Sequence, residues 1–200
     1  MAAVWSLGPA SLPSPGPRLF TLLFFSHHRD GRIPMFDHLV SERPHPSLGT
    51  HAETYGRFIG SWRGTYRDPH PEGEESGPLE VHFAWALEGR AVQDVWIAPA
   101  PPLEADRTYR RQMYGTTLRV FDPATQVWRV DWWNPGRGVH CALVGRRLGE
   151  QIVQLGYWDD RPQRWRFLDI TPNAFRWQAH RLDDNGESWS LVTEFALQRI

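Results

Sequence analysis

The chain has 200 residues, with 22 basic and 23 acidic side chains and a formal net charge of −1. This length suits one domain that buries enough apolar surface to fold alone. Because the charges balance without a run of one sign, the sequence offers no electrostatic footprint for nucleic acid or anionic lipid. Every basic residue is arginine, which excludes Schiff-base chemistry and a lysine-dependent phosphate-binding loop.

Residues 1–49 are rich in Pro, Ser and Gly and show no sustained period, so we expect a disordered tail before a domain at 50–200. The apolar run at 19–25 is too short to span a bilayer, and it fits a secretory signal poorly. An alternative is that Met35 is the true start. The single cysteine, Cys141, excludes an internal disulfide and fits a reducing compartment, so we expect a cytoplasmic protein with no membrane span.

A short helix over about 51–58 is predicted by the capping-box spacing of Thr50-His51-Ala52-Glu53. Ten alternating runs follow, at about 60–67, 79–87, 90–98, 112–121, 126–133, 138–146, 150–157, 163–170, 175–181 and 188–199. The loops are too short for parallel crossovers, apart from one longer link at 99–111. The sequence therefore predicts an all-β fold, a ten-stranded antiparallel up-and-down β-barrel that closes to avoid exposed edges.

Aromatic side chains define the interior of the expected barrel, since the chain carries 11 Trp, 10 Phe and 5 Tyr. On the first strand Trp62, Gly64 and Tyr66 share one face. The two-residue loop Glu88-Gly89 fixes a register that places Phe83 opposite Asp94, so Asp94 points inward among the rings.

The remaining strands are assigned by the same alternation. On the fourth, fifth and eighth strands, the side chains expected to face the interior are those of Tyr114, Thr116, Leu118, Val120, Trp128, Val130, Trp132, Trp165, Phe167 and Asp169. Arg119, Arg129 and Asp131 are expected outside. The sixth and seventh strands carry apolar residues at both parities, which leaves His140 and Gln154 unplaced.

Three features resemble the calycin superfamily of lipocalins, fatty-acid-binding proteins and nitrobindins: Gly60-Ser61-Trp62 after a short helix, the antiparallel meander, and Arg199 at the end of the last strand. The resemblance implies that Trp62 lies at the closed end of the barrel with Arg199 across its ring. The segments "FAWALEGRAVQDVW" and "WRFLDITPNAFRW" also resemble uncharacterised bacterial lipocalin-like proteins.

Nitrobindins resemble the first strand through Gly60-X-Trp62-X-Gly64, and they bind haem through a histidine of the last strand. That strand, "SLVTEFALQRI", has no histidine, and His140 and His180 are the only strand-borne substitutes. We therefore expect no cofactor. No metal site is expected either, because the histidines lack paired spacing and the one cysteine, Cys141, is predicted to be packed and inert.

The first functional hypothesis is binding of a small hydrophobic, aromatic or polycyclic molecule inside the barrel. Its expected walls are Phe83, Trp85, Trp96, Tyr114, Trp132, Phe167 and Trp177, although each ring could equally be ordinary core packing. The second hypothesis is an enzyme, a cyclase, isomerase or hydratase, in which Asp94, alone or with Asp169, is the general acid or base. In the alternative for Asp94, its carboxylate pairs with Arg90 and only holds the barrel together. The third is a structural module or homodimer, with Trp133 and Trp158 at its surface.

Overall fold

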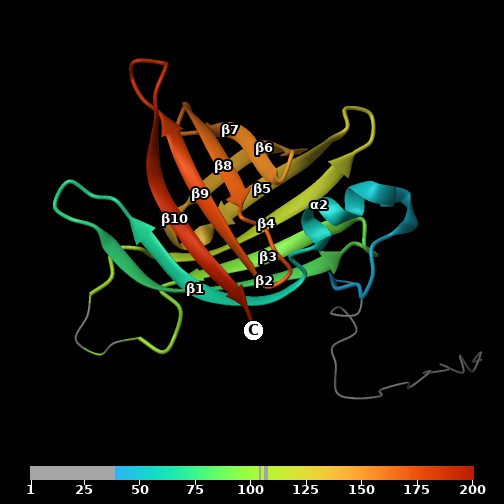
Figure 1. The fold of residues 1–200 in the computed structure, drawn as a ribbon, viewed down its shortest axis with the longest axis horizontal. Helices are drawn as coiled ribbons and strands as arrows, with labels where there is room; N and C mark the ends of the chain where they lie inside the picture. Colours follow the sequence, from blue (N-terminus) through green and yellow to red (C-terminus); the bar gives the residue numbers. More distant parts are fainter. Residues whose placement is uncertain (1–38, 104, 106–107) are drawn as a thin grey trace, which may run out of the picture. The chain divides into compact units, whose positions relative to one another are not determined.

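The computed structural model describes residues 39–103, 105 and 108–200, and it contains a closed barrel of ten antiparallel strands. Each strand pairs with its neighbours in sequence, and β1 closes the ring by pairing with β10 (Figure 1). The strands are β1 (Gly60–Asp68), β2 (Glu75–Ala86), β3 (Ala91–Ala98), β4 (Met113–Asp122), β5 (Val127–Asn134), β6 (Val139–Leu148), β7 (Gln151–Trp158), β8 (Arg161–Leu168), β9 (Ala174–Leu182) and β10 (Trp189–Arg199). The predicted ten-stranded barrel is confirmed.

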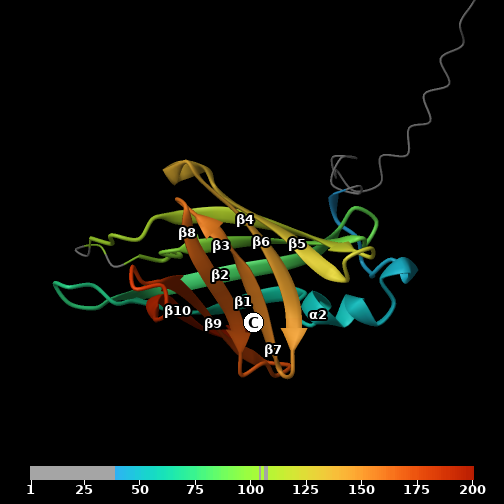
Figure 2. The ribbon, with the colours of Figure 1, turned by 90° about the horizontal axis from the view of Figure 1, so that it is seen from above.

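The two ends of the barrel differ. The short helices η1 (Pro46–His51) and α2 (Ala52–Gly56) lie at one end, which we call the closed end, and the β1–β2 hairpin and the β3–β4 link lie at the other, which we call the mouth (Figures 1 and 2). A third short helix, η2 (Pro135–Arg137), also lies at the mouth, between β5 and β6. Among the described residues, no helix is long and apolar enough to cross a membrane.

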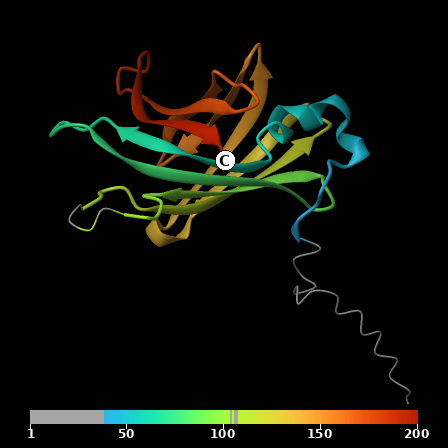
Figure 3. The ribbon, with the colours of Figure 1, turned by 60° about the horizontal axis from the view of Figure 1, so that its bottom comes forward.

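The chain contacts the barrel before the predicted domain boundary at residue 50. Ser41 donates its N–H to the Trp85 carbonyl at 2.8 Å, and Leu48 is buried. Figure 3 shows this segment, in blue, passing the end of the barrel where the short helices lie. The helix predicted over 51–58 is present as the shorter α2, which begins after His51 without a side-chain cap. Residues 1–38, including the alternative start Met35, lie outside the described residues.

The motif Gly60-X-Trp62-X-Gly64 builds the closed end. Trp62 is fully buried and donates its indole N–H to the Phe58 carbonyl at 2.6 Å, while the Arg199 guanidinium lies 4.1 Å from its ring. Gly60 has a φ of +123°, a backbone conformation that residues with a side chain rarely adopt. At Gly64 an added Cβ would lie 1.8 Å from the Ala196 carbonyl oxygen of β10. The two glycines therefore allow the sharp entry into β1 and its close approach to β10.

The register derived from the Glu88-Gly89 hairpin is confirmed. Phe83 lies opposite Asp94, and Trp85 lies opposite Val92. Asp94 is 1% exposed, so it does point into the barrel.

The inward face predicted for β4 is wrong by one residue. Tyr114 is 69% exposed and Val120 is also exposed, while Thr117 and Arg119 are buried. Two contacts explain this parity. Arg119 faces inward because it pairs with the buried Asp94 carboxylate, and Gly115 faces inward because the Trp132 ring fills the space where a Cβ would lie, 2.3 Å from Cη2.

The inward placement of Asp169 is also wrong. β8 ends at Leu168, and Asp169 adopts a φ of +50° that turns the chain out of the sheet. Its exposed carboxylate accepts a hydrogen bond from Arg176 Nε at 2.5 Å.

Candidate functional site

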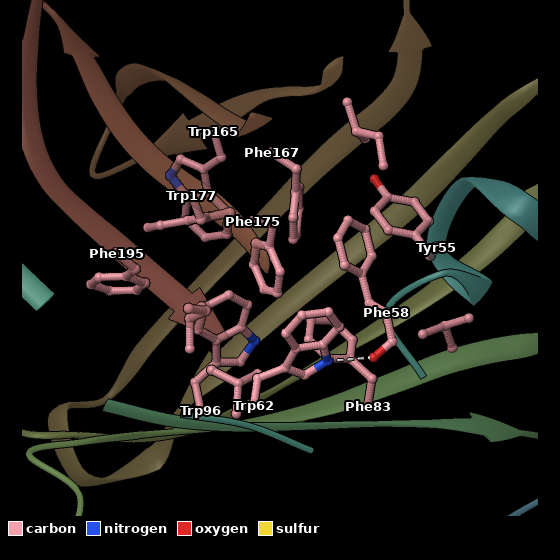
Figure 4. Packing of buried hydrophobic residues seen from close by; sticks show 14 of the residues in the cluster. Tyr55, Phe58, Trp62, Phe83, Trp96, Trp165, Phe167, Phe175, Trp177 and Phe195 are labelled. Atoms are coloured by element: carbon pink, nitrogen blue, oxygen red, sulfur yellow. Dashed lines mark hydrogen bonds between the residues drawn. The ribbon is translucent and has the colours of Figure 1, made fainter. Parts of the chain in front are cut away.

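The closed half of the barrel is filled with aromatic rings. Phe58, which follows α2, packs against Phe167 and Phe175 at centroid distances of 4.8 Å, and Trp62 lies equally close to Phe175 (Figure 4). Phe83 packs against Phe58 on the other side. Since these rings interdigitate in the manner of a solid core, side chains fill this half of the barrel.

The half of the barrel next to the mouth is hollow. A cavity of about 440 Å³ opens there between the β1–β2 hairpin, the β3–β4 link and η2. Its aromatic walls come from six strands, and Trp177 stacks on Phe195 with centroids 4.9 Å apart. The rings that line it are Trp96, Trp132, Trp158, Trp165, Trp177 and Phe195.

A buried ion pair forms the floor of the cavity. Arg119 lines the cavity and binds the Asp94 carboxylate below it, which also accepts the Thr117 N–H at 2.8 Å. The Arg119 guanidinium lies 4.9 Å from the Tyr55 ring, and Tyr55 accepts a hydrogen bond from Gln154 at 2.9 Å. Burial raises the pKa of Tyr55 to about 12, although the charge of Arg119 opposes this rise. The floor is thus a polar network inside an apolar core.

The position of Asp94 bears on its two predicted roles. Its carboxylate does not line the cavity, and both of its oxygens are bound, one by Thr117 and one by Arg119. The arginine partner is Arg119 and not Arg90, which lies in the hairpin beside Glu88 and His45. The geometry therefore favours a structural role for Asp94.

The rim of the mouth is charged and largely neutralised by pairing. Arg111 binds Asp68 with two hydrogen bonds of 2.8 and 2.6 Å. Burial on its own would raise the pKa of Glu75, but hydrogen bonds from Tyr66 and from the Arg110 side chain and backbone lower it to about 2. Arg137 of η2 also lines the cavity, is exposed, and forms no ion pair with any described residue.

The predicted wall residues fall into three groups. Trp96, Trp132 and Trp177 line the cavity. Phe83 and Phe167 belong to the filled core. Trp85 packs over Gly56 at the closed end, where it borders an open outer hollow of about 740 Å³ with no other aromatic residue among the described residues that line it. Tyr114 lies outside the barrel.

Sequence reasoning missed several lining residues. Trp165 was assigned inward parity but not to the wall, Phe195 was not named as a wall residue, and Arg119 was assigned to the outer face. The signal for Arg119 was present, because an inward Asp94 requires a buried cation or donor nearby.

Three residues considered for other chemistry do not reach the cavity. His140 stacks on the outward Trp133 with centroids 4.0 Å apart, and His180 has outward parity on β9, so neither fits an axial haem ligand inside the barrel. Cys141 is buried and donates to the Tyr157 carbonyl at 3.2 Å. Burial raises its pKa to about 12, so the thiol stays protonated and is not an activated nucleophile.

A closed ten-stranded barrel, with a helix and a Trp–Arg contact at one end and a hollow at the other, defines a calycin-like, lipocalin-like fold. Two solved structures are similar to this chain. Rv2717c from M. tuberculosis is 14% identical, with 78% of this chain and 99% of that chain covered and a TM-score of 0.50. The S-type phycobiliprotein lyase CPES from Guillardia theta is 12% identical, with 74% and 90% covered and a TM-score of 0.49. No family model and no curated protein sequence matches the chain.

Proposed function

We propose that the protein binds a small, flat aromatic molecule in the hollow half of its barrel. The observation that supports this proposal is the cavity of about 440 Å³, walled by tryptophan and phenylalanine rings above a core that is already filled. Ligand sites commonly occupy about 300–1,000 Å³ and are lined by aromatic groups with few polar ones. A cavity of this kind favours a ligand that stacks between rings.

The charges around the cavity favour a ligand with an anionic or acceptor group at its outer end. Four arginines line the cavity against two carboxylates, those of Asp68 and Glu75. Those two carboxylates are bound by Arg111 and Arg110, and Arg119 is neutralised by Asp94. Among the described residues that line the cavity, Arg137 is the arginine without an ion-pair partner. The planar guanidinium of arginine matches the geometry of a carboxylate or sulfonate.

The cavity can be tested by blocking it. Ala179 lines the cavity, whereas Ala142 is exposed on the outer face of β6. We expect the fluorescent probe anilinonaphthalene sulfonate to bind the wild type and Ala142→Phe equally. Ala179→Phe should bind it at least about tenfold more weakly, because a phenyl ring then fills the space for the probe. Circular dichroism checks that both variants fold. Equal binding by all three proteins would place the probe elsewhere and contradict the proposal.

The charge preference has its own comparison. Phenylnaphthylamine has a similar ring system without the sulfonate. Arg137→Gln should therefore weaken binding of the sulfonate probe and leave binding of the neutral probe unchanged. Arg129→Gln, on the outer face of β5, is the matched control. If Arg137→Gln weakens both probes equally, the anionic end is excluded while aromatic binding stands.

The geometry gives less support to the other two hypotheses. The carboxylates and the histidine that line the cavity, Asp68, Glu75 and His70, lie at the rim in contact with arginines, and Asp94 lies behind Arg119. A homodimer through the outward Trp133 stays a prediction.

A further inference from the structure

A cluster of cations lies on the outer face of the barrel, on the opposite side of the sheet from the cavity. We call it the basic cluster, and it comprises Arg164 and Arg166 of β8 with His180 of β9. The two arginines are two residues apart on one strand, so their side chains leave the same face about 7 Å apart. His180 lies directly opposite Arg164 in the β8–β9 register.

Each member of the basic cluster is held in place by an uncharged group. The Arg164 guanidinium lies 4.5 Å from the Trp189 ring of β10. Arg166 donates to the Gln178 amide oxygen at 2.8 Å and lies 3.5 Å from His180 Nε2. The cations are therefore positioned, but by partners that carry no negative charge.

The basic cluster has no counter-charge in the described part of the chain. The acid facing it, Glu194 of β10, is bound by Arg67, Arg176 and Gln178 instead. Moreover, Arg164 Nε, Arg166 Nε and His180 Nδ1 are buried without a hydrogen-bond partner. Native proteins leave few buried donors unpaired, and each such donor costs free energy.

The same imbalance is seen in the proton affinity of the cluster. Burial lowers the pKa of His180, and the charges of Arg166 and Arg164 lower it further, while Glu194 acts in the opposite direction. Burial and Arg166 also lower the pKa of Arg164. Two like charges and a neutral imidazole on one patch of sheet are unfavourable unless an anion compensates them.

We propose that the basic cluster is a binding site for an oxyanion of the phosphate class. Two guanidinium groups offer planar donors that match a tetrahedral anion, and a phosphate group carries up to two negative charges, which balance the two arginines. Trp189 and the exposed Leu155 flank the arginines, so a phosphate carried on an aromatic or apolar group also fits. Because Gln163 and Trp165 alternate with the arginines and point inward, the site is independent of the cavity.

The test is a titration of the full chain with inorganic phosphate at constant ionic strength, followed by the NMR signals of His180, which His180→Asn assigns. We expect a saturable shift and a rise in the pKa of His180, since a bound anion offsets the charges of Arg164 and Arg166. Arg164→Gln and Arg166→Gln should each weaken binding by about tenfold or more, because each removes a charge-assisted hydrogen bond. Arg146→Gln is the control, as Arg146 is an exposed outer-face arginine of β6.

Further arms identify the source of the phosphate. Phenyl phosphate and a phosphoserine peptide are titrated in the same way, and tighter binding than inorganic phosphate would point to a phosphorylated molecule or protein, respectively. The proposal is overturned if none of the three probes gives a saturable shift, or if Arg146→Gln weakens binding as much as Arg164→Gln does.

Discussion

The buried ion pair at the cavity floor gives the sharpest stability prediction. In the folded protein the side chains of Arg119 and Asp94 are 2% and 0% exposed. Arg119→Met keeps the apolar stem but leaves the Asp94 carboxylate buried with the Thr117 N–H as its remaining donor. Removing one partner of a buried pair costs about 3–5 kcal/mol, which lowers the folding equilibrium constant by roughly 10² to 10⁴.

The assay is urea unfolding monitored by circular dichroism. Arg63→Met is the control, because Arg63 pairs with Glu80 but its side chain is 57% exposed, and such a pair contributes about 0–1 kcal/mol. Asp94→Leu and the double variant Asp94→Leu/Arg119→Met complete a double-mutant cycle. We expect the double variant to be more stable than either single variant, since it buries no unpaired charge.

Two results would refute this reasoning. One is an Arg119→Met variant that loses no more stability than Arg63→Met. The other is a double variant whose loss equals the sum of the two single losses, because the two charges would then not interact.

Three further predictions concern the closed end and the rim. Gly64→Ala should lower the melting temperature by on the order of 10 °C, because its Cβ would lie 1.8 Å from the Ala196 carbonyl oxygen. Gly136→Ala should change the melting temperature little, because its Cβ would meet only Asn134 Oδ1, at 3.9 Å; equal melting temperatures for the two variants would contradict the clash. Arg199→Gln should cost about 2 kcal/mol or more in urea unfolding, since it removes the contact with Trp62 and hydrogen bonds to three backbone carbonyls. The pKa of Glu75 in the folded protein is about 2, below the ordinary glutamate value of about 4.3, so the stability that Glu75 contributes is present above pH 4.3 and is lost as the pH falls toward 2. Glu75→Gln should therefore lose less stability than the wild type when the pH is lowered over this range. Equal pH dependence of the two proteins would contradict a role for the Glu75 carboxylate.

The fold could be read from the sequence because closure and register depend on local signals. The turn signal Glu88-Gly89 predicted the pairing of β2 with β3, and hence the inward direction of Asp94, although the loop in the structure spans the four residues 87–90. The parity of β4 could not be read in the same way, since Thr and Leu on its outer face look as apolar as the residues inside. The deciding fact was a charge pair between strands, Asp94 with Arg119, which no alternation of hydrophobicity encodes.

The rim of the cavity depends on contacts between segments far apart in the chain. Arg110 and Arg111 come from the β3–β4 link, yet they bind Glu75 and Asp68 of the β1–β2 hairpin. Composition identifies 99–111 as a long connection but does not say where it folds back. For this reason the polar half of the site was visible only in three dimensions.

The position of the hollow follows from the size of the inward side chains along each strand. From the closed end to the mouth, β9 presents Phe175, Trp177 and then Ala179, and β10 presents Leu197, Phe195 and then Thr193. At the closed end the large side chains pack against the rings of α2 and of the segment after it. At the mouth the small side chains of Ala179 and Thr193 leave space next to the tryptophans. The cavity is therefore created by residue choice on a barrel that could have been filled, which is why a single phenyl ring at Ala179 should be enough to close it.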